Sequence, residues 1–264
     1  MLLEAKELYK SYKKPAGIVR KEEVRILKGV SFTLLEGECL GIIGESGSGK
    51  STLGRILIGL EKPDSGAIQV KRSDVSSIKN NPVKQKSSVV FQDYSTSVNP
   101  RFKVVDVLFE PMNSLKKLRK KDKLEKAVAL LKKVGLSEIY LYRYPHELSG
   151  GQLQRVCIAR AIAANPAFIV LDEAISSLDV SIQVQVMDLL MDLKKQLNIA
   201  YIFITHDLTA ITYICDRVLF FKDGVVIEEV QNMAELRNVK EDYSKALLHA
   251  AMEMNGGENG AYEI

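Results

Sequence analysis

Hydrophobic and polar positions along the first 60 residues follow the patterns of strands and then of a helix. The apolar run Cys39–Ile43 ends at glycines, as expected of a fully buried parallel strand. Ahead of it, Val24–Leu27 and Val30–Leu35 predict two strands that are separated by a turn at Gly29. After it, apolar residues recur at helical spacing and predict a helix over Ser51–Leu60.

The same alternation returns in the second half of the chain. Phe168–Leu171 and Tyr201–Thr205 are short apolar runs that predict buried strands. The periodicity of Val156–Ala164 and Ile182–Gln196 predicts helices next to these strands. Because strands that alternate with helices form mainly parallel sheets, we predict an α/β fold with a parallel core.

The middle of the chain has a different pattern, which is helical from about Val104 to Leu141. Basic residues are concentrated in this stretch, but Asp122 and Glu125 and an apolar stripe are interleaved with them. A solvent-exposed helix face explains this pattern better than a nucleic-acid surface does, so we expect no nucleic-acid partner. The basic residues are Lys116, Lys117, Arg119, Lys120, Lys121, Lys123 and Lys126.

The amino-acid composition is that of an ordinary globular protein with a buried core. The chain contains no run of about 18 apolar residues, and its start lacks the apolar core of a signal peptide. We therefore expect no membrane-spanning segment. Cys39, Cys157 and Cys215 lack the spacing of metal ligands and are odd in number, which favours buried free thiols in a reducing compartment.

The strongest chemical signal is the segment Gly44–Ser51, which fits the pattern G-x-x-x-x-G-K-S. In such a loop the backbone N–H groups point at phosphate oxygens, and the start of the following helix adds positive potential. We expect Lys50 to contact the β- and γ-phosphates of ATP and the Ser51 hydroxyl to bind Mg²⁺. The residues predicted to surround the phosphates are Gly44, Glu45, Ser46, Gly47, Ser48, Gly49, Lys50, Ser51 and Thr52.

Two predicted strands end in polar residues that suit the same chemistry. Asp172 and Glu173 follow one strand, and His206 follows the next. The carboxyl ends of parallel strands lie at the edge where α/β sheets bind ligands. We expect Asp172 to hold Mg²⁺, Glu173 to deprotonate the attacking water and His206 to contact the γ-phosphate.

A second glycine-rich segment, Leu148–Gln152 (LSGGQ), comes directly before another predicted helix. Ser149 is able to cap this helix, whose N-terminus is a second anion site. One nucleotide does not need two such sites in one chain. The segment is therefore predicted to complete the ATP site of a partner subunit.

These motifs together resemble the nucleotide-binding subunits of ABC transporters over roughly residues 2–250. The resemblance implies a P-loop NTPase fold of ABC type, with an antiparallel β subdomain and a helical subdomain inserted at about 93–160. Residues 251–264 are expected to form a flexible tail. By the same resemblance, Tyr12 stacks on adenine, Gln92 senses Mg²⁺, and Asp179 couples the two ATP sites. Ser149, Gly150, Gly151 and Gln152 then face the nucleotide of the opposite subunit.

The resemblance also implies the partners of the chain. These are a second ABC ATPase subunit in a heterodimer, two transmembrane permease subunits and an extracytoplasmic solute-binding protein. The expected location is peripheral, on the cytoplasmic face of the inner or plasma membrane. Soluble relatives that act on DNA or ribosomes usually carry two modules, coiled-coil insertions or zinc ligands, none of which the sequence shows. A non-hydrolysing subunit is expected to lack Glu173 or His206, and both are present.

Three further segments are similar to the peptide and nickel importer branch of the family: Phe91–Arg101, Arg143–Ser149 and Tyr243–Leu248. Ala174 departs from most of that branch, which has proline after the catalytic Asp-Glu pair, but is shared with the nickel importer's second ATPase. The segments Asp172–Asp179 and Gly151–Arg160 are also more similar to the nickel importer's ATPase than to those of peptide importers. We therefore expect uptake of nickel or a metal chelate, with di- and oligopeptides as the alternative. These segments are not expected to contact cargo. They indicate common ancestry with those importers and do not themselves determine which cargo is transported.

Overall fold

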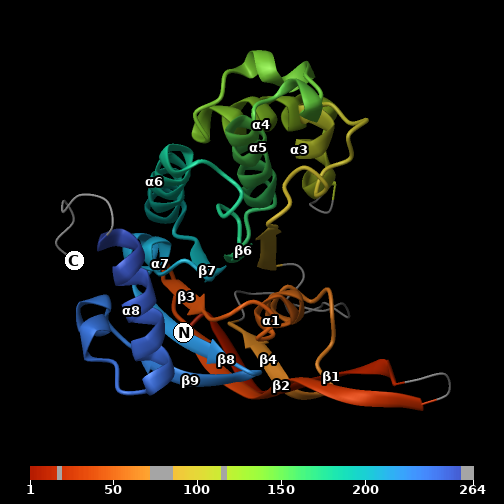
Figure 1. Cartoon of the computed structure of the whole chain (residues 1–264). Coiled ribbons are helices and arrows are strands. Elements are labelled where there is room, and N and C mark those ends of the chain that lie inside the picture. Colours follow the sequence, from red (N-terminus) through yellow and green to blue (C-terminus); the bar gives the residue numbers. More distant parts are fainter. Residues whose placement is uncertain (17–19, 72–85, 114–117, 257–264) are drawn as a thin grey trace.

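The computed structural model describes residues 1–16, 20–71, 86–113 and 118–256. A six-stranded sheet runs through its centre in the order β5-β6-β7-β3-β8-β9 (Figure 1). Neighbouring strands pair in parallel as far as β8, and β9 pairs with β8 in antiparallel fashion. The expectation of an α/β fold with a mainly parallel core is confirmed. The strands are β3 (Cys39–Ile43), β5 (Ser87–Val90), β6 (Phe168–Asp172), β7 (Ala200–Thr205), β8 (Arg217–Lys222) and β9 (Val225–Val230).

A second, antiparallel sheet has the order β2-β1-β4, with β1 at Leu3–Ala16, β2 at Arg20–Leu34 and β4 at Ser65–Val70. The prediction of two strands separated by a turn at Gly29 is wrong, because β2 runs through this residue. Gly29 has a φ of 85° and lies at a register shift between the pairs Leu8–Val30 and Tyr9–Lys28. The glycine therefore makes a β-bulge and does not end the strand.

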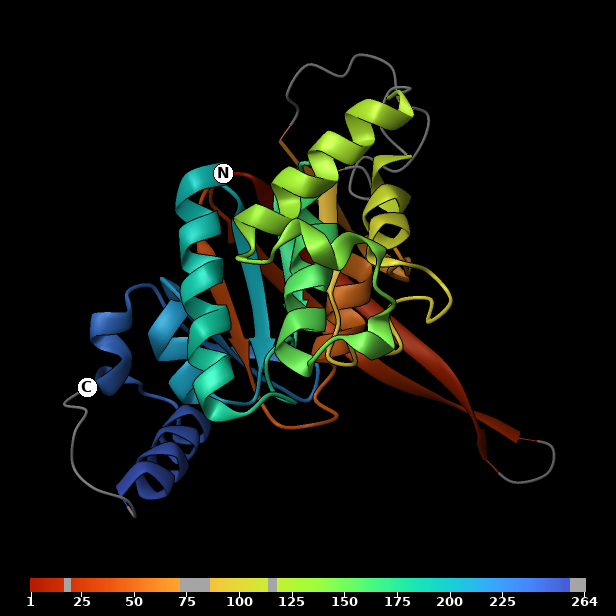
Figure 2. The same ribbon diagram turned by 90° about the horizontal axis from the view of Figure 1, so that it is seen from above.

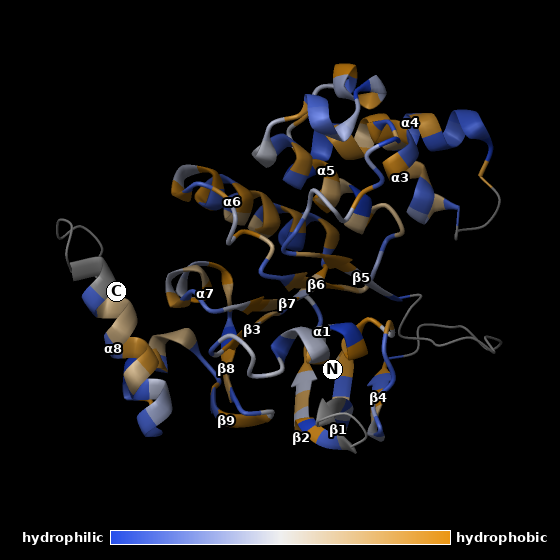
Figure 3. Ribbon diagram, turned by 45° about the vertical axis from the view of Figure 1, so that its right-hand side comes forward, coloured by the Kyte–Doolittle hydropathy of each residue, from blue (hydrophilic) through white to orange (hydrophobic). Residues whose placement is uncertain are grey.

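The central sheet is buried on both faces, because alternate residues of its strands belong to two different cores. On one face, Leu40 and Ile42 of β3 pack with the helix α1 (Lys50–Leu57) and the antiparallel sheet. On the other face, Cys39 and Ile43 pack with residues of the helices α5 to α7. Figure 3 shows β3, β6 and β7 in hydrophobic colours, whereas the helices carry both kinds of residue. Parallel sheets covered on both faces require such continuous apolar strands.

The remaining helices fall into two groups. One group is inserted between β5 and β6 and rises away from the sheet (Figures 1 and 2). The other group follows β6 and covers the sheet. The inserted group comprises α3 (Val104–Met112), α4 (Lys120–Lys133), the 3₁₀ turns η1 (Glu138–Tyr142) and η2 (Pro145–Glu147), and α5 (Gly150–Ile162). The second group comprises α6 (Val180–Leu197), α7 (Leu208–Ile214), η3 (Met233–Asn238) and α8 (Asp242–Gly256).

The inserted group runs from 104 to 162, and the helical subdomain is expected at about 93–160. Part of the basic stretch, residues 116 and 117, lies outside the described residues. Within the part that is described, Arg119 bonds to Asp122 and Lys121 pairs with Glu125 across the exposed face of α4. The helix α8 runs to Gly256, so the first six residues of the predicted flexible tail are helical, and residues 257–264 lie outside the described range.

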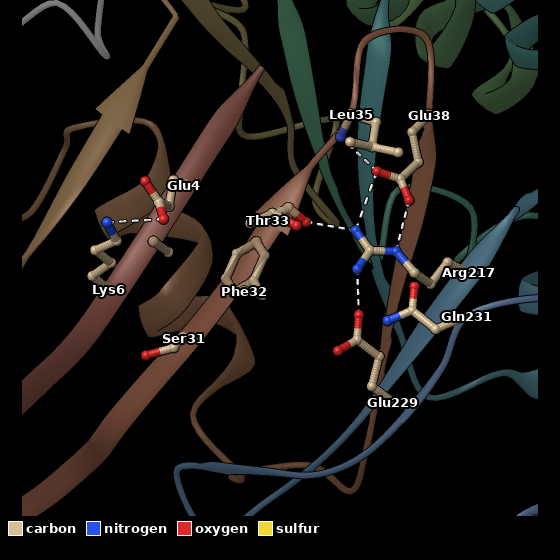
Figure 4. Close-up of a pocket in the computed structure, with 11 residues that line it drawn as sticks. Glu4, Lys6, Ser31, Phe32, Thr33, Leu35, Glu38, Arg217, Glu229 and Gln231 are labelled. Carbon is tan, nitrogen blue, oxygen red and sulfur yellow. Dashed lines mark hydrogen bonds and ion pairs between the residues drawn. The ribbon is translucent and has the colours of Figure 1, made fainter. Parts of the chain in front are cut away.

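A buried ion pair lies where the two sheets meet. The Arg217 guanidinium of β8 donates to the Glu38 carboxylate at 2.7 and 3.2 Å and to the Thr33 carbonyl of β2 at 2.6 Å (Figure 4). It also donates to Glu229 of β9. Arg217 and Glu38 have side chains only 7% and 6% exposed, so each charge depends on the other for compensation.

The three cysteines are buried free thiols, as predicted. Among the described residues, no helix combines the length and the hydrophobicity needed to cross a membrane.

Candidate functional site

The glycine-rich loop connects the end of β3 to the start of α1, and its backbone folds around the Lys50 side chain. Lys50 Nζ donates to the carbonyl oxygens of Gly44 at 2.6 Å and Glu45 at 2.7 Å. Gly49 caps the helix with a left-handed φ of 107°, which side chains other than glycine rarely adopt. A Cβ atom at Gly44 would lie 1.9 Å from the Phe221 carbonyl oxygen, so only glycine fits there. The backbone of the loop thus holds the Lys50 ammonium group in place.

Lys50 is buried, with 5% exposure, although it carries the positive charge of the loop. Burial lowers the pKa of its ammonium group, and the carboxylates of Glu173 and Asp172 act against this shift. Among the described residues, no carboxylate forms an ion pair with Lys50, and a desolvated ammonium group of this kind attracts phosphate oxygens more strongly than an exposed one does. This environment suits the predicted contact with the β- and γ-phosphates.

Ser51 and Asp172 meet at the carboxyl end of β6. The Ser51 hydroxyl donates to Asp172 Oδ1 at 3.3 Å. Burial raises the pKa of the Asp172 carboxyl, while the Ser51 hydrogen bond acts against this. A hydroxyl beside a carboxylate is an all-oxygen donor set of the kind that Mg²⁺ prefers, so these two residues fit the predicted metal.

Glu173 and His206 also lie together, at the ends of β6 and β7. His206 Nδ1 is 3.3 Å from Glu173 Oε1, and the Glu173 backbone N–H donates to the Ile204 carbonyl at 2.8 Å. Glu173 has a φ of 48°, a left-handed value that is unusual outside glycine. Such backbone strain is concentrated at functional sites, where it aims a side chain. Here the strained residue is the predicted catalytic base.

The Leu148–Gln152 segment lies at the start of α5, as predicted. Ser149 caps the helix: its Oγ accepts from the Gln152 N–H at 3.3 Å, and its N–H donates to Gln152 Oε1 at 3.0 Å. Gln152 Nε2 also donates to the Tyr140 hydroxyl at 3.0 Å. These bonds stay within the inserted helical group. A Cβ at Gly150 would lie 2.7 Å from the Tyr94 hydroxyl, and one at Gly151 would lie 2.9 Å from Ile182, so both glycines pack closely against these side chains.

The other predicted site residues are placed as follows. Gln92 is exposed and lies just after β5. Asp179 is the N-cap residue of α6. The Tyr12 hydroxyl of β1 donates to Glu61 Oε1 at 2.6 Å. Within the phosphate loop, Glu45, Ser46, Gly47 and Ser51 are exposed, whereas Ser48 and Thr52 are buried.

The structure thus brings the phosphate loop, Asp172, Glu173 and His206 to one edge of the sheet. The bonds described for Ser149 and Gln152 do not reach that edge. The open hollow between the two sheets in Figure 4 lies elsewhere, and none of the predicted site residues lines it.

Two contacts beside the site residues were not predicted. Gln154, in the same helix as Ser149, donates from Nε2 to the Ala174 carbonyl directly after Glu173, at 2.5 Å. Tyr243 of α8 accepts from the backbone N–H of Glu45 at 3.1 Å. Gln154 follows the LSGGQ motif, and Tyr243 lies in a segment that marks descent, but neither pattern says which backbone group the side chain contacts.

Comparison with known proteins shows which family the chain belongs to. The family model described as "ABC transporter" matches residues 27–176, more than half of the chain. The chain belongs to the ABC transporter family. Its ATP-binding proteins are ATPases coupled to transport, and so is this chain.

Curated ABC relatives cover most of the chain. The metal-staphylopine import ATP-binding protein CntF of Staphylococcus aureus is 43% identical, covering 94% of this chain and 98% of its own. The nickel import ATP-binding protein NikE of Rhodospirillum rubrum is 42% identical, covering 86% and 83%. The dipeptide transport ATP-binding protein DppF of Escherichia coli is 40% identical, covering 96% and 77%.

Among solved structures, the chain is similar to a post-hydrolysis dimer of the ATP-binding cassette MJ0796 bound to ADP and Pi. The TM-score is 0.74 at 29% identity, covering 87% of this chain and 98% of that one. The ABC cassette fold that the motifs implied is therefore confirmed.

Proposed function

We propose that this ABC ATPase binds MgATP between its phosphate loop and the Asp172–Glu173 edge, and that hydrolysis there drives an importer. The observation that carries the proposal is the contact between Ser51 and Asp172, at 3.3 Å. It joins the phosphate loop to the strand end that bears Glu173, so one ligand between them touches both.

Each residue at this edge has a chemical task. Lys50 binds the β- and γ-phosphates, and Ser51, Asp172 and Gln92 hold Mg²⁺, which neutralises phosphate charge when bound. Glu173 takes the proton of the attacking water. His206 contacts the γ-phosphate and, through its 3.3 Å approach to Glu173, orients that base. Tyr12 stacks on the adenine.

The ATP site is completed by a second ABC ATPase subunit, in a heterodimer. Ser149 through Gln152 form a helix start suited to an anion, and their described bonds stay within the inserted helices. The dimeric assembly of MJ0796 supports this arrangement. Asp179, at the start of α6, couples the two sites. Two permease subunits and a solute-binding protein complete the importer, and the chain docks on the cytoplasmic face of the membrane.

The two-subunit site is tested by measuring ATP hydrolysis over a range of protein concentrations, with and without the second ATPase. We expect slow hydrolysis by the isolated chain, because each site lacks its second half. Specific activity then rises with concentration or on adding the partner ATPase. A specific activity that depends on neither would contradict the shared site.

The cargo that we propose is nickel or a nickel-type metal chelate. The names of CntF and NikE, at 43% and 42% identity, support a metal. Peptides are the second candidate, because DppF is 40% identical over 96% of the chain.

Deleting the gene and measuring both cellular nickel and the uptake of labelled di- and oligopeptides decides between the two cargoes. We expect lower nickel content with normal peptide uptake. Normal metal content with lost peptide uptake would overturn the metal assignment and leave the ATPase assignment intact. Restoring uptake with the intact gene, but not with a Glu173→Gln copy, ties the phenotype to ATP hydrolysis.

A further inference from the structure

The C-terminal helix α8 reaches the phosphate loop through one side chain. The Tyr243 hydroxyl accepts a hydrogen bond from the Glu45 N–H at 3.1 Å and donates to the Phe221 carbonyl at 3.4 Å. These residues are far apart in the sequence, and they meet because β8 lies directly beside β3, which leads into the loop. The segment Tyr243–Leu248 thus contacts the phosphate loop through Tyr243, in addition to indicating ancestry.

The bonded N–H of Glu45 belongs to the same peptide unit as the Gly44 carbonyl. Lys50 Nζ donates to that carbonyl at 2.6 Å. One peptide plane is therefore held from both sides, by Lys50 at its oxygen and by Tyr243 at its nitrogen. Hydrogen bonds arranged in such a chain polarise and strengthen one another.

We infer that Tyr243 is a positioning residue for ATP binding, which orients the Gly44–Glu45 peptide and through it the Lys50 ammonium group. The inference rests on the proposed role of Lys50 at the β- and γ-phosphates. Tyr243 touches no reacting atom in this scheme. It reduces the freedom of the group that does, and so lowers the cost of ordering the loop around phosphate.

The surroundings of Tyr243 keep its hydroxyl in one place and in one protonation state. Lys222 Nζ lies 4.7 Å from the centre of the Tyr243 ring, within cation–π range. Burial raises the pKa of the Tyr243 hydroxyl, so it stays protonated and can donate to Phe221 while it accepts from Glu45.

The start of α8 is also fixed. The Glu228 carboxylate of β9 accepts from the backbone N–H groups of Lys240 at 2.7 Å and Glu241 at 3.2 Å, just before the helix. Since these bonds set where α8 begins, they also set where the hydroxyl of Tyr243 lies.

The variant Tyr243→Phe tests the inference, because it removes the hydroxyl and leaves the ring and its contact with Lys222. We expect the Kd for ATP to rise roughly twofold to tenfold, the range for losing one net hydrogen bond. Without nucleotide, the Glu45 backbone amide should exchange its hydrogen faster than in the unmodified protein. The matched control is Tyr213→Phe on α7, whose hydroxyl donates to Asp188 at 2.7 Å; it should change neither quantity.

The inference requires that Tyr243→Phe both raise the Kd for ATP and speed the exchange of the Glu45 amide. An unchanged Kd with faster amide exchange shows that the bond exists but does not position Lys50, and this overturns the inference. An unchanged exchange rate overturns it as well, whatever happens to the Kd. Lys50→Ala is measured alongside: if it leaves the Kd for ATP unchanged, the proposed role of Lys50 is wrong. If it raises the Kd while Tyr243→Phe does not, only the role of Tyr243 fails.

Discussion

Lys50 and Glu173 lie at the same edge of the sheet but act at different stages of the reaction. Lys50 binds phosphate before and during hydrolysis, whereas Glu173 is needed only when water attacks. We expect Lys50→Ala to weaken ATP binding about tenfold to a hundredfold, as for a lost hydrogen bond to a charged group. Glu173→Gln keeps the shape of the site and should leave ATP affinity within about twofold while slowing hydrolysis roughly 10²- to 10⁴-fold.

Retention of labelled nucleotide, measured for both variants and the unmodified chain, separates these roles. The Glu173→Gln protein should keep bound ATP, and the Lys50→Ala protein should lose it. Equal retention by the two variants would contradict the assignment.

For single residues, the sequence predicts which side chains meet at the carboxyl ends of neighbouring strands. Asp172, Glu173 and His206 follow apolar strands, and parallel strands place their carboxyl ends at one edge, so their meeting is a consequence of topology. The contact of Tyr243 with Glu45 does not follow from any comparable rule of topology. It depends on how α8 packs on the strands near β3, which side-chain periodicity does not encode.

Among the elements, α5 carries a residue with two tasks. Ser149 caps the helix through Gln152 and is proposed to face the phosphate of a partner subunit. Ser149→Ala removes the cap and should lower the free energy of unfolding by about 0.5–2 kcal/mol. Ser149→Asp should keep the cap, because aspartate is an equally good N-cap residue.

The two tasks are separated by measuring unfolding and hydrolysis in the same variants. The negative charge of Ser149→Asp repels the γ-phosphate, so hydrolysis by the assembled complex should fall while stability and ATP binding by the isolated chain remain. Full hydrolysis by this variant in the complex would show that the helix start does not meet the nucleotide.

Element boundaries show where sequence patterns fail. Gly29 favours a turn in the sequence, but a left-handed glycine serves equally in a bulge, and only the partner strand decides between them. The partner is β1, whose own apolar pattern is broken by lysines and tyrosines. By contrast, Cys39–Ile43 is fully buried, and its predicted bounds match β3. Patterns are clearest where both faces of a strand are covered.

For the whole molecule, the buried Arg217–Glu38 pair lies where the two sheets meet, and Arg217 also bonds to the Thr33 carbonyl of β2. Arg217→Ala leaves the Glu38 carboxylate buried without a counter-charge, which should lower the free energy of unfolding by about 3–5 kcal/mol. Lys71→Ala is the control, because its pair with Glu36 is exposed and screened by solvent, so its loss should change stability little. Urea denaturation measures both. A loss for Arg217→Ala no larger than that of the control would show that the pair is dispensable.

The strand order of the central sheet has a consequence for how the protein is made. The strand β3, which leads into the phosphate loop, lies between β7 and β8, so Cys39 can pair with Tyr201, and Leu40 with Arg217, only after those later strands have been synthesised. At translation rates of about 5–20 residues per second, the wait lasts roughly 10–30 s. During that time the apolar strand β3 lacks the neighbouring strands that bury it. The phosphate loop can therefore take its folded position only after residue 217 has been synthesised, so the nascent chain exposes aggregation-prone surface before it can bind ATP.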